Sequence, residues 1–190
     1  MSAERFDRIY GYRHVKRAFE VAITGNHTIC LMNIGNTPAV QQFANIAREN
    51  GIPCTVLRRC PCGNLGSVEF DCTCTDEAIT THRLGHEYRS AMDSDIFMEV
   101  GVTSSGGYGE FDAIIYARID AGKAAPMPSN DLSRTYMSLL ESATRMLELN
   151  ESQVKRAQAV AVTIARLAKS KIVHPAHLAE SIQYRARKEG

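Results

Sequence analysis

The feature that most constrains the fold is a strand–helix–strand pattern over residues 28–57. Residues 28–32 form a short apolar run that predicts a buried strand, and the Gly35–Asn36 turn follows it. Pro38 suits the first turn of a helix, which is predicted to end near Asn50. Residues 54–57 are typical of a second strand. Such a unit predicts two parallel strands joined by a right-handed crossover, and therefore an α/β fold.

Apolar residues at helical spacing predict further elements on both sides of this unit. They comprise a helix over 11–24, one helix from Asp76 to about Tyr88, a third strand over 95–102, a helix over 111–121, and three helices beginning near Asp131, Asn150 and Pro175. The stretch APMPSN, residues 125–130, is typical of a linker. We therefore expect an α/β part over residues 1–124 and a helical C-terminal part over residues 131–190.

Composition narrows the class of protein. The chain has 190 residues, a formal net charge of +1 and 44% hydrophobic residues. The near-neutral charge does not support nucleic acid as a partner. No apolar stretch approaches the roughly 20 residues of a membrane span, so we expect no membrane partner. The N-terminus has no pattern of a secretory signal, and we expect a cytoplasmic protein. There, six cysteines favour free thiols or metal ligands over disulfides.

Four of the cysteines lie in one loop, residues 59–75, with the sequence RCPCGNLGSVEFDCTCT. Two close pairs separated by a glycine-bearing segment can supply four thiolates to one tetrahedral zinc ion. One residue separates the members of each pair, whereas zinc knuckles usually have two to four. The alternative is a loop of thiols that never closes on a metal. A zinc held by four sulfurs would be structural. The predicted metal ligands are Cys60, Cys62, Cys72 and Cys74.

The turn after the first strand, ICLMNIGNTPAV, has the layout of a phosphate-binding loop but lacks a lysine. Backbone N–H groups at a helix N-terminus can bind an anion without a lysine. Pro38 removes one such donor. The residues of this degenerate nucleotide-binding turn are Asn33, Gly35, Asn36 and Thr37.

Several stretches together resemble one family. They are GYRHVKRAFEVAITGNHTICLMNIG, RRCPCGNLG followed by CTCT, DIFMEV, and the ending AVAVTIARLAKSKIVHPAHLAESIQYR. In this order they resemble the magnesium-chelatase ATPase subunits, and within them the ComM-type branch of AAA+ proteins. The resemblance implies a nucleotide-binding α/β lobe followed by a helical lid. The fold expected here is a truncated AAA+ (P-loop-like) lobe with a small parallel sheet, followed by such a lid.

The chain departs from this family where the resemblance would place the chemistry. The Gly-Lys-Thr that closes the family's phosphate loop falls on Pro38, Ala39 and Val40. A long segment with the family's acidic strand is absent between Asn50 and Cys54, and an expected arginine falls at Asp93. The family's strand order of 5-1-4-3-2 leaves strands 5, 1 and 4 side by side after this deletion. We therefore expect the fold to survive and ATP hydrolysis to be lost.

Three functions follow as hypotheses. The first is a catalytically inactive binding, scaffolding or regulatory module with a structural zinc loop. The second is a protein that still binds ATP, ADP or another anion at the degenerate turn without efficient hydrolysis, although we do not expect ATP or ADP as a cofactor. The third is an enzyme that uses Cys60 or Cys72 with His82, His86 or His174.

The deletion also predicts a surface. The strand over 54–57 loses its outer neighbour and becomes a sheet edge, which can pair with another strand. The expected partner is a second copy of the chain or an AAA+ relative. Thr55→Pro is expected to disrupt such a dimer.

Overall fold

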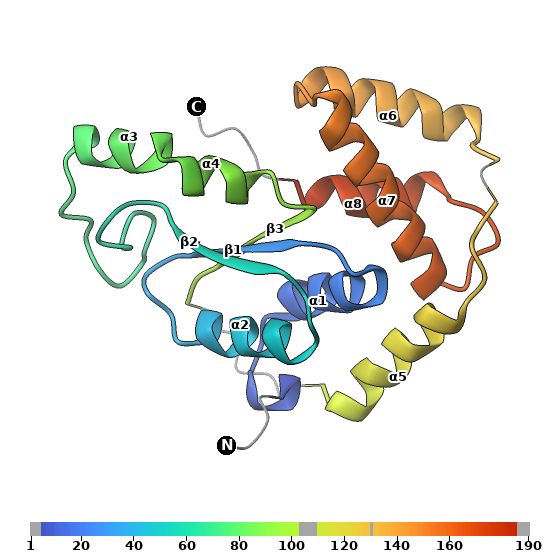
Figure 1. Ribbon diagram of the computed structural model, residues 1–190, viewed down its shortest axis with the longest axis horizontal. Coiled ribbons are helices and arrows are strands. Elements are labelled where there is room, and N and C mark those ends of the chain that lie inside the picture. The colour runs from blue at the N-terminus through green and yellow to red at the C-terminus, as the bar shows by residue number, and fades with distance from the viewer. Residues whose placement is uncertain (1–4, 103–109, 130, 186–190) are drawn as a thin grey trace.

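A computed structural model describes residues 5–102, 110–129 and 131–185, and within them it has a mixed α/β fold (Figure 1). Three parallel strands form one sheet in the order β2-β1-β3. The central strand is β1 (Ile29–Asn33), which pairs with β2 (Cys54–Arg58) on one side and β3 (Ile96–Val100) on the other. The predicted parallel pair and the adjacency of the three strands are confirmed.

The first face of the sheet is covered by α1 (Arg13–Gly25) and α2 (Ala39–Glu49), below the strands in Figure 1. Both helices have a strongly amphipathic pattern, which drives the apolar side of each onto the strands. Ile29 and Leu31 of β1 alternate toward this face. Here lies the main core, in which Phe19 and Phe43 pack with ring centroids 5.2 Å apart.

The opposite face is covered by α4 (His86–Met92), which follows α3 (Asp76–Leu84). Tyr88 and Ala91 of α4 pack with buried residues of the strands in a smaller cluster. The prediction of one helix from Asp76 to about Tyr88 is wrong, because the chain breaks at Gly85. This residue is extended, with φ −57° and ψ 143°, and its N–H bonds to the carbonyl of His82. A Cβ atom at this position would lie 3.1 Å from that carbonyl oxygen, a tight contact that glycine avoids.

The remaining helices follow the predicted order. A short 3-10 turn, η1 (Phe6–Arg8), precedes α1. The later helices are α5 (Asp112–Ala124), α6 (Arg134–Met146), α7 (Glu151–Leu167) and α8 (Pro175–Gln183). Asn150 and Gln153 form a capping box at the start of α7, where a helix was predicted to begin. In the described part of the chain, every helix is too short or too polar to cross a membrane.

The C-terminal helices pack on the α/β part through shared core residues. Val160 and Ile164 of α7, and Tyr184 after α8, belong to the main core. A separate cluster joins α6, α7 and α8 around Tyr136 and Leu178. The predicted domain boundary at residues 125–130 stays a prediction, and Asn130 lies outside the described residues.

The two edges of the sheet differ. On β3, the N–H of Phe97 donates to the carbonyl of Tyr184 at 2.7 Å, so the chain after α8 covers the start of that edge. On β2, Val56 is 42% exposed and neither Thr55 nor Arg58 is buried. The predicted exposed edge is therefore present at β2.

The hydrogen-bond register corrects the expected effect of Thr55→Pro. The N–H of Ile29 donates to the carbonyl of Pro53 at 3.0 Å. In a parallel ladder the carbonyl of Ile29 then accepts a hydrogen bond from the N–H two residues after Pro53, which is that of Thr55. Thr55 therefore faces β1, and a proline there would break the sheet. The N–H of Val56 faces outward.

Candidate metal centre

The cysteine loop lies beside the glycine turn because of the sheet. The turn follows the carboxyl end of β1, and the loop, residues 59–75, follows the carboxyl end of β2. Parallel neighbours end at the same edge of a sheet, so the two connections emerge side by side. The loop ends where Thr75 caps α3 by accepting a hydrogen bond from the N–H of Ala78 at 3.2 Å.

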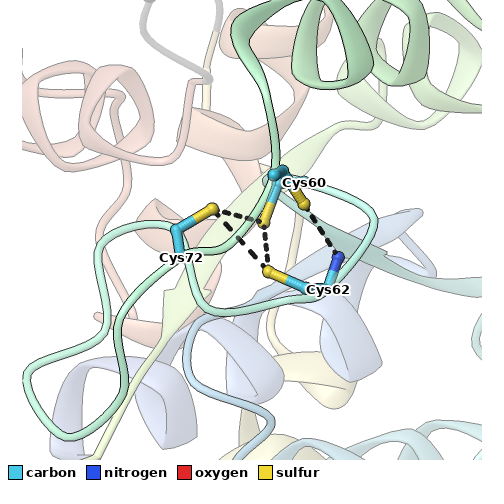
Figure 2. A group of neighbouring side chains, drawn as sticks. Cys60, Cys62 and Cys72 are labelled. Atoms are coloured by element: carbon cyan, nitrogen blue, oxygen red, sulfur yellow. Dashed lines mark hydrogen bonds between the residues drawn. The ribbon is translucent and has the colours of Figure 1, made fainter.

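The four predicted cysteines converge on one point. All four Sγ atoms lie within 4.8 Å of one another. Figure 2 shows Cys60, Cys62 and Cys72 directed toward each other, and their Sγ–Sγ distances are 3.4 Å, 3.7 Å and 3.6 Å. A tetrahedral ion with Zn–S bonds of about 2.3 Å would hold its sulfurs about 3.8 Å apart. The sulfur spacing is therefore that of a site for a single metal ion.

Backbone N–H groups point at the sulfurs. The N–H of Cys62 donates to Cys74 Sγ, and that of Leu65 donates to Cys60 Sγ, each at 3.4 Å. Gly63, between them, has φ +85°, which a side chain would strain. Such donors stabilise negative charge on sulfur and hold the ligands in place. They explain how pairs with one intervening residue can close on a common centre.

The thiols of the loop share their protons unequally. Backbone N–H groups of Asn64 and Thr73 lower the pKa of Cys62 to about 6. For Cys72 the N–H of Cys74 favours the thiolate, but burial and the neighbouring sulfurs outweigh it and raise its pKa to about 12. Thiolates are the metal-binding form of cysteine, so a cation would displace the remaining protons.

The donor set fixes what such a site can do. Four sulfurs fill a tetrahedral shell and leave no position for water or substrate, which is the pattern of a structural zinc. An iron–sulfur cluster would need its cysteines farther apart, since iron and sulfide atoms would lie between them. These four cysteines therefore could hold one metal ion.

Two backbone N–H donors of the glycine turn are hydrogen-bonded within the protein. The N–H of Gly35 donates to the carbonyl of Gly63 at 3.0 Å, and the N–H of Thr37 donates to Asn33 Oδ1 at 3.0 Å. Asn36 donates its side-chain amide to the carbonyl of Cys62 at 3.1 Å. Thr37 is buried, with its hydroxyl 3.3 Å from that of Tyr12. The four predicted turn residues are thus brought together, with the cysteine loop against them.

The suggested histidine partners make other contacts. His82 Nε2 lies 2.9 Å from the carbonyl oxygen of Arg58, and the ring of His174 lies 5.4 Å from that of His177, centroid to centroid. Within the described residues, the group around the four sulfurs contains cysteines alone. Cys30 is buried in the core, whereas Cys54 is only half-buried.

The sequence did not predict the contacts between the glycine turn and the cysteine loop, which involve Asn36, Gly63 and Ser67. Gly63 and Gly66 both have positive φ, so glycines in the loop were the available signal for tight turns. Their pairing with the Gly35 turn joins segments far apart in the sequence, which local patterns do not encode.

Two comparisons with known proteins bear on the family. A search of curated proteins finds no match. The family model described as magnesium chelatase, subunit ChlI C-terminal, matches residues 121–185. The match begins near the end of α5, includes α6, α7 and α8, and covers about a third of the chain. Residues 121–185 are therefore similar to the C-terminal domain of magnesium chelatase subunit ChlI, which is consistent with a magnesium-chelatase-like protein.

Proposed function

We propose that this protein is a catalytically inactive, magnesium-chelatase-like AAA+ relative that acts as a binding or scaffolding module. A structural zinc ion in the cysteine loop would stabilise this module. The observation that carries the proposal is the cluster of four sulfurs within 4.8 Å, next to a turn that has no lysine. The strand order β2-β1-β3 supports the AAA+ assignment, because it is the order left when two strands are deleted from the family's order 5-1-4-3-2.

Catalysis of phosphoryl transfer needs groups that this chain lacks at the matching positions. Pro38 stands where the resemblance would place the glycine of Gly-Lys-Thr, and Ala39 stands at the lysine. Loss of a phosphate-binding lysine and a metal-binding acid removes the charge stabilisation on which this reaction depends. Hydrolysis of ATP is therefore not expected.

Binding of ATP, ADP or another anion at the turn is the less supported alternative. Two of its N–H donors, those of Gly35 and Thr37, already have partners within the protein. An anion would have to displace the carbonyl of Gly63 and the side chain of Asn33 to reach them. Such an exchange lowers the affinity for an anion, because the displaced carbonyl of Gly63 and side chain of Asn33 would each need a new hydrogen-bond donor.

The proposal includes self-association through β2. The start of the β3 edge is covered by the chain itself, whereas the outward N–H of Val56 and the exposed residues around it have no strand beside them in the described structure. A second copy offers the same strand, and two identical strands can pair across a two-fold axis. A continuous six-stranded sheet would result.

Two measurements on the purified protein test the proposal. Metal analysis is expected to give about one zinc per chain, and Cys72→Ser should lose it while Cys54→Ser retains it. A malachite-green assay with ATP and magnesium should give no phosphate release above a protein-free blank. Magnesium-dependent release would refute the inactive assignment. Protein purified without a bound metal, and unable to take up Zn²⁺, would refute the zinc loop.

A further inference from the structure

The glycine turn and the cysteine loop contact each other through several independent bonds. Asn36 Nδ2 donates to the carbonyl of Cys62 at 3.1 Å and to Asn64 Oδ1 at 3.2 Å. The N–H of Gly35 donates to the carbonyl of Gly63 at 3.0 Å. Two residues of the turn therefore hold three consecutive residues of the loop, and one of these three is a predicted metal ligand.

The two segments also fit each other sterically. A Cβ atom added to Gly35 would lie 2.7 Å from Ser67 Oγ, and one added to Gly63 would lie 2.5 Å from Asn36 Oδ1. Real Cβ atoms essentially never approach another atom this closely, so the side chain of Ser67 or Asn36 would have to move. Both glycines also have positive φ, at +72° and +85°. The close approach of turn and loop thus depends on glycine on each side.

We infer that Asn36 is a positioning residue for the metal site, and that metal occupancy and the order of the Gly35–Thr37 turn depend on each other. The inference rests on the proposed metal centre and adds a role for the degenerate turn. A segment with the layout of a phosphate-binding loop here serves as the outer support of the cysteine loop.

The chemistry supports this role for Asn36 in particular. Its amide group fixes the carbonyl of Cys62 and the side chain of Asn64, so it restrains the backbone on both sides of Gly63. Groups that orient metal ligands in this way typically change metal affinity by roughly 10- to 100-fold when removed. The backbone of Asn36 is left-handed, with φ 53°, which asparagine and glycine tolerate better than alanine.

The first experiment measures zinc affinity by competition with a chromophoric chelator. Asn36→Gly removes the side chain without straining the left-handed backbone, and it should weaken Zn²⁺ binding by roughly 10- to 100-fold. Asn36→Asp keeps the shape, removes the donated hydrogen bonds and should also weaken binding. Asn45→Ala is the matched control, because this half-buried asparagine of α2 accepts hydrogen bonds from Gln41 and Arg48 of the same region, and it should leave the affinity unchanged. Co²⁺ substitution gives a second readout, because a displaced Cys62 would alter its absorption spectrum.

The second experiment tests the reverse direction in the unmodified protein. Coupling between two sites is reciprocal, so removal of the metal should loosen the turn. Hydrogen exchange at residues 33–37 should lose protection when Zn²⁺ is removed by a chelator, while exchange in α7 stays as it was. This readout does not depend on whether an Asn36 variant folds.

The outcomes separate this inference from the proposed function. If the wild-type chain binds no Zn²⁺, both fail. If it binds Zn²⁺ but Asn36→Gly and Asn36→Asp have wild-type affinity, the positioning role of Asn36 is overturned and the zinc loop stands. Unchanged exchange at residues 33–37 after metal removal would overturn the mutual dependence alone.

Discussion

His27 Nε2 lies 2.8 Å from Thr163 Oγ1, and this contact joins the segment before β1 to the middle of α7. Both side chains are buried. On the other side of the ring, His27 Nδ1 lies 3.8 Å from a carboxylate oxygen of Asp95, at the start of β3. A chain of polar groups therefore runs from the sheet into the C-terminal helices, in a region where an unpaired polar atom would be costly.

Asp95 makes folding stability depend on pH. Burial alone would raise its pKa, but interactions with His27 and with the N–H and hydroxyl of Thr28 lower it to about 2. An acid with a lowered folded pKa stabilises the fold above its unfolded pKa of about 3.9, and this stabilisation is lost as the pH falls toward 2. The contribution is about 2 kcal/mol.

Asp95→Asn should therefore lower the free energy of unfolding near pH 6 and flatten its decline below pH 4. Urea unfolding of both proteins at several pH values measures the difference. Metal-free protein should be used throughout, because acid also protonates the cysteine ligands. Parallel curves for the two proteins between pH 6 and pH 3 would contradict the lowered pKa.

Much of the fold follows from short-range patterns. The apolar run at residues 28–32, the Gly35 turn and the strand over 54–57 predict the parallel pair, because each signal is local and of the right length. The capping box at Asn150 likewise gives the start of α7. The break at Gly85 was missed because a single glycine is tolerated inside helices, and the packing of Tyr88 on the sheet decides where the second helix begins.

The candidate site was predictable in its ligands but not in its surroundings. The spacing of Cys60, Cys62, Cys72 and Cys74 identifies the four sulfurs. The contact between Asn36 and Cys62 arises because the turn after β1 and the loop after β2 leave the same end of the sheet. The predicted parallel pair already implied that neighbourhood. The individual hydrogen bonds did not follow, because they depend on the positive φ angles of Gly35 and Gly63.

Gly122 on α5 tests the packing between α5, α1 and α7. A Cβ atom there would lie 2.8 Å from Leu167 Cδ2 and 3.0 Å from Thr24 Cγ2. Gly122→Val should overpack this junction and lower the free energy of unfolding by about 1 to 3 kcal/mol. Urea unfolding followed by circular dichroism measures it. Lys123→Ala, one residue along and exposed, should change stability by less than about 0.5 kcal/mol. Equal effects of the two substitutions would refute the close contact.

Thiol alkylation should distinguish Cys62 of the cysteine loop from the cysteines of the sheet. Burial raises the pKa of Cys30 to about 12 and that of Cys54 to about 11. At pH 8 only about one Cys54 thiol in a thousand is then ionised, and the thiolate is the reactive form. Once the metal is chelated, iodoacetamide should modify Cys62, whose pKa is about 6, long before it modifies Cys30 or Cys54.

Mass spectrometry of peptides over a time course reads this order directly. Protein loaded with Zn²⁺ is the control and should be protected at all four loop positions. Rapid modification of Cys30 in the folded protein would contradict its burial, and equal rates with and without metal would argue against a metal at the loop.

Val56→Pro tests whether β2 joins two copies of the chain. Val56 directs its N–H away from β1, so proline can replace it without breaking the ladder to the central strand, as at other sheet edges. It would remove an outward donor and place a ring against any added strand.

If copies associate through β2, light scattering should show Val56→Pro shifted toward the monomer. Val56→Thr retains the N–H and a β-branched side chain, and it should keep the wild-type mass. Thr55→Pro serves as the contrasting case, because its N–H faces Ile29 and its loss should unfold the sheet instead. A Val56→Pro protein with native circular dichroism and the same mass as wild type would exclude this edge as the contact between copies.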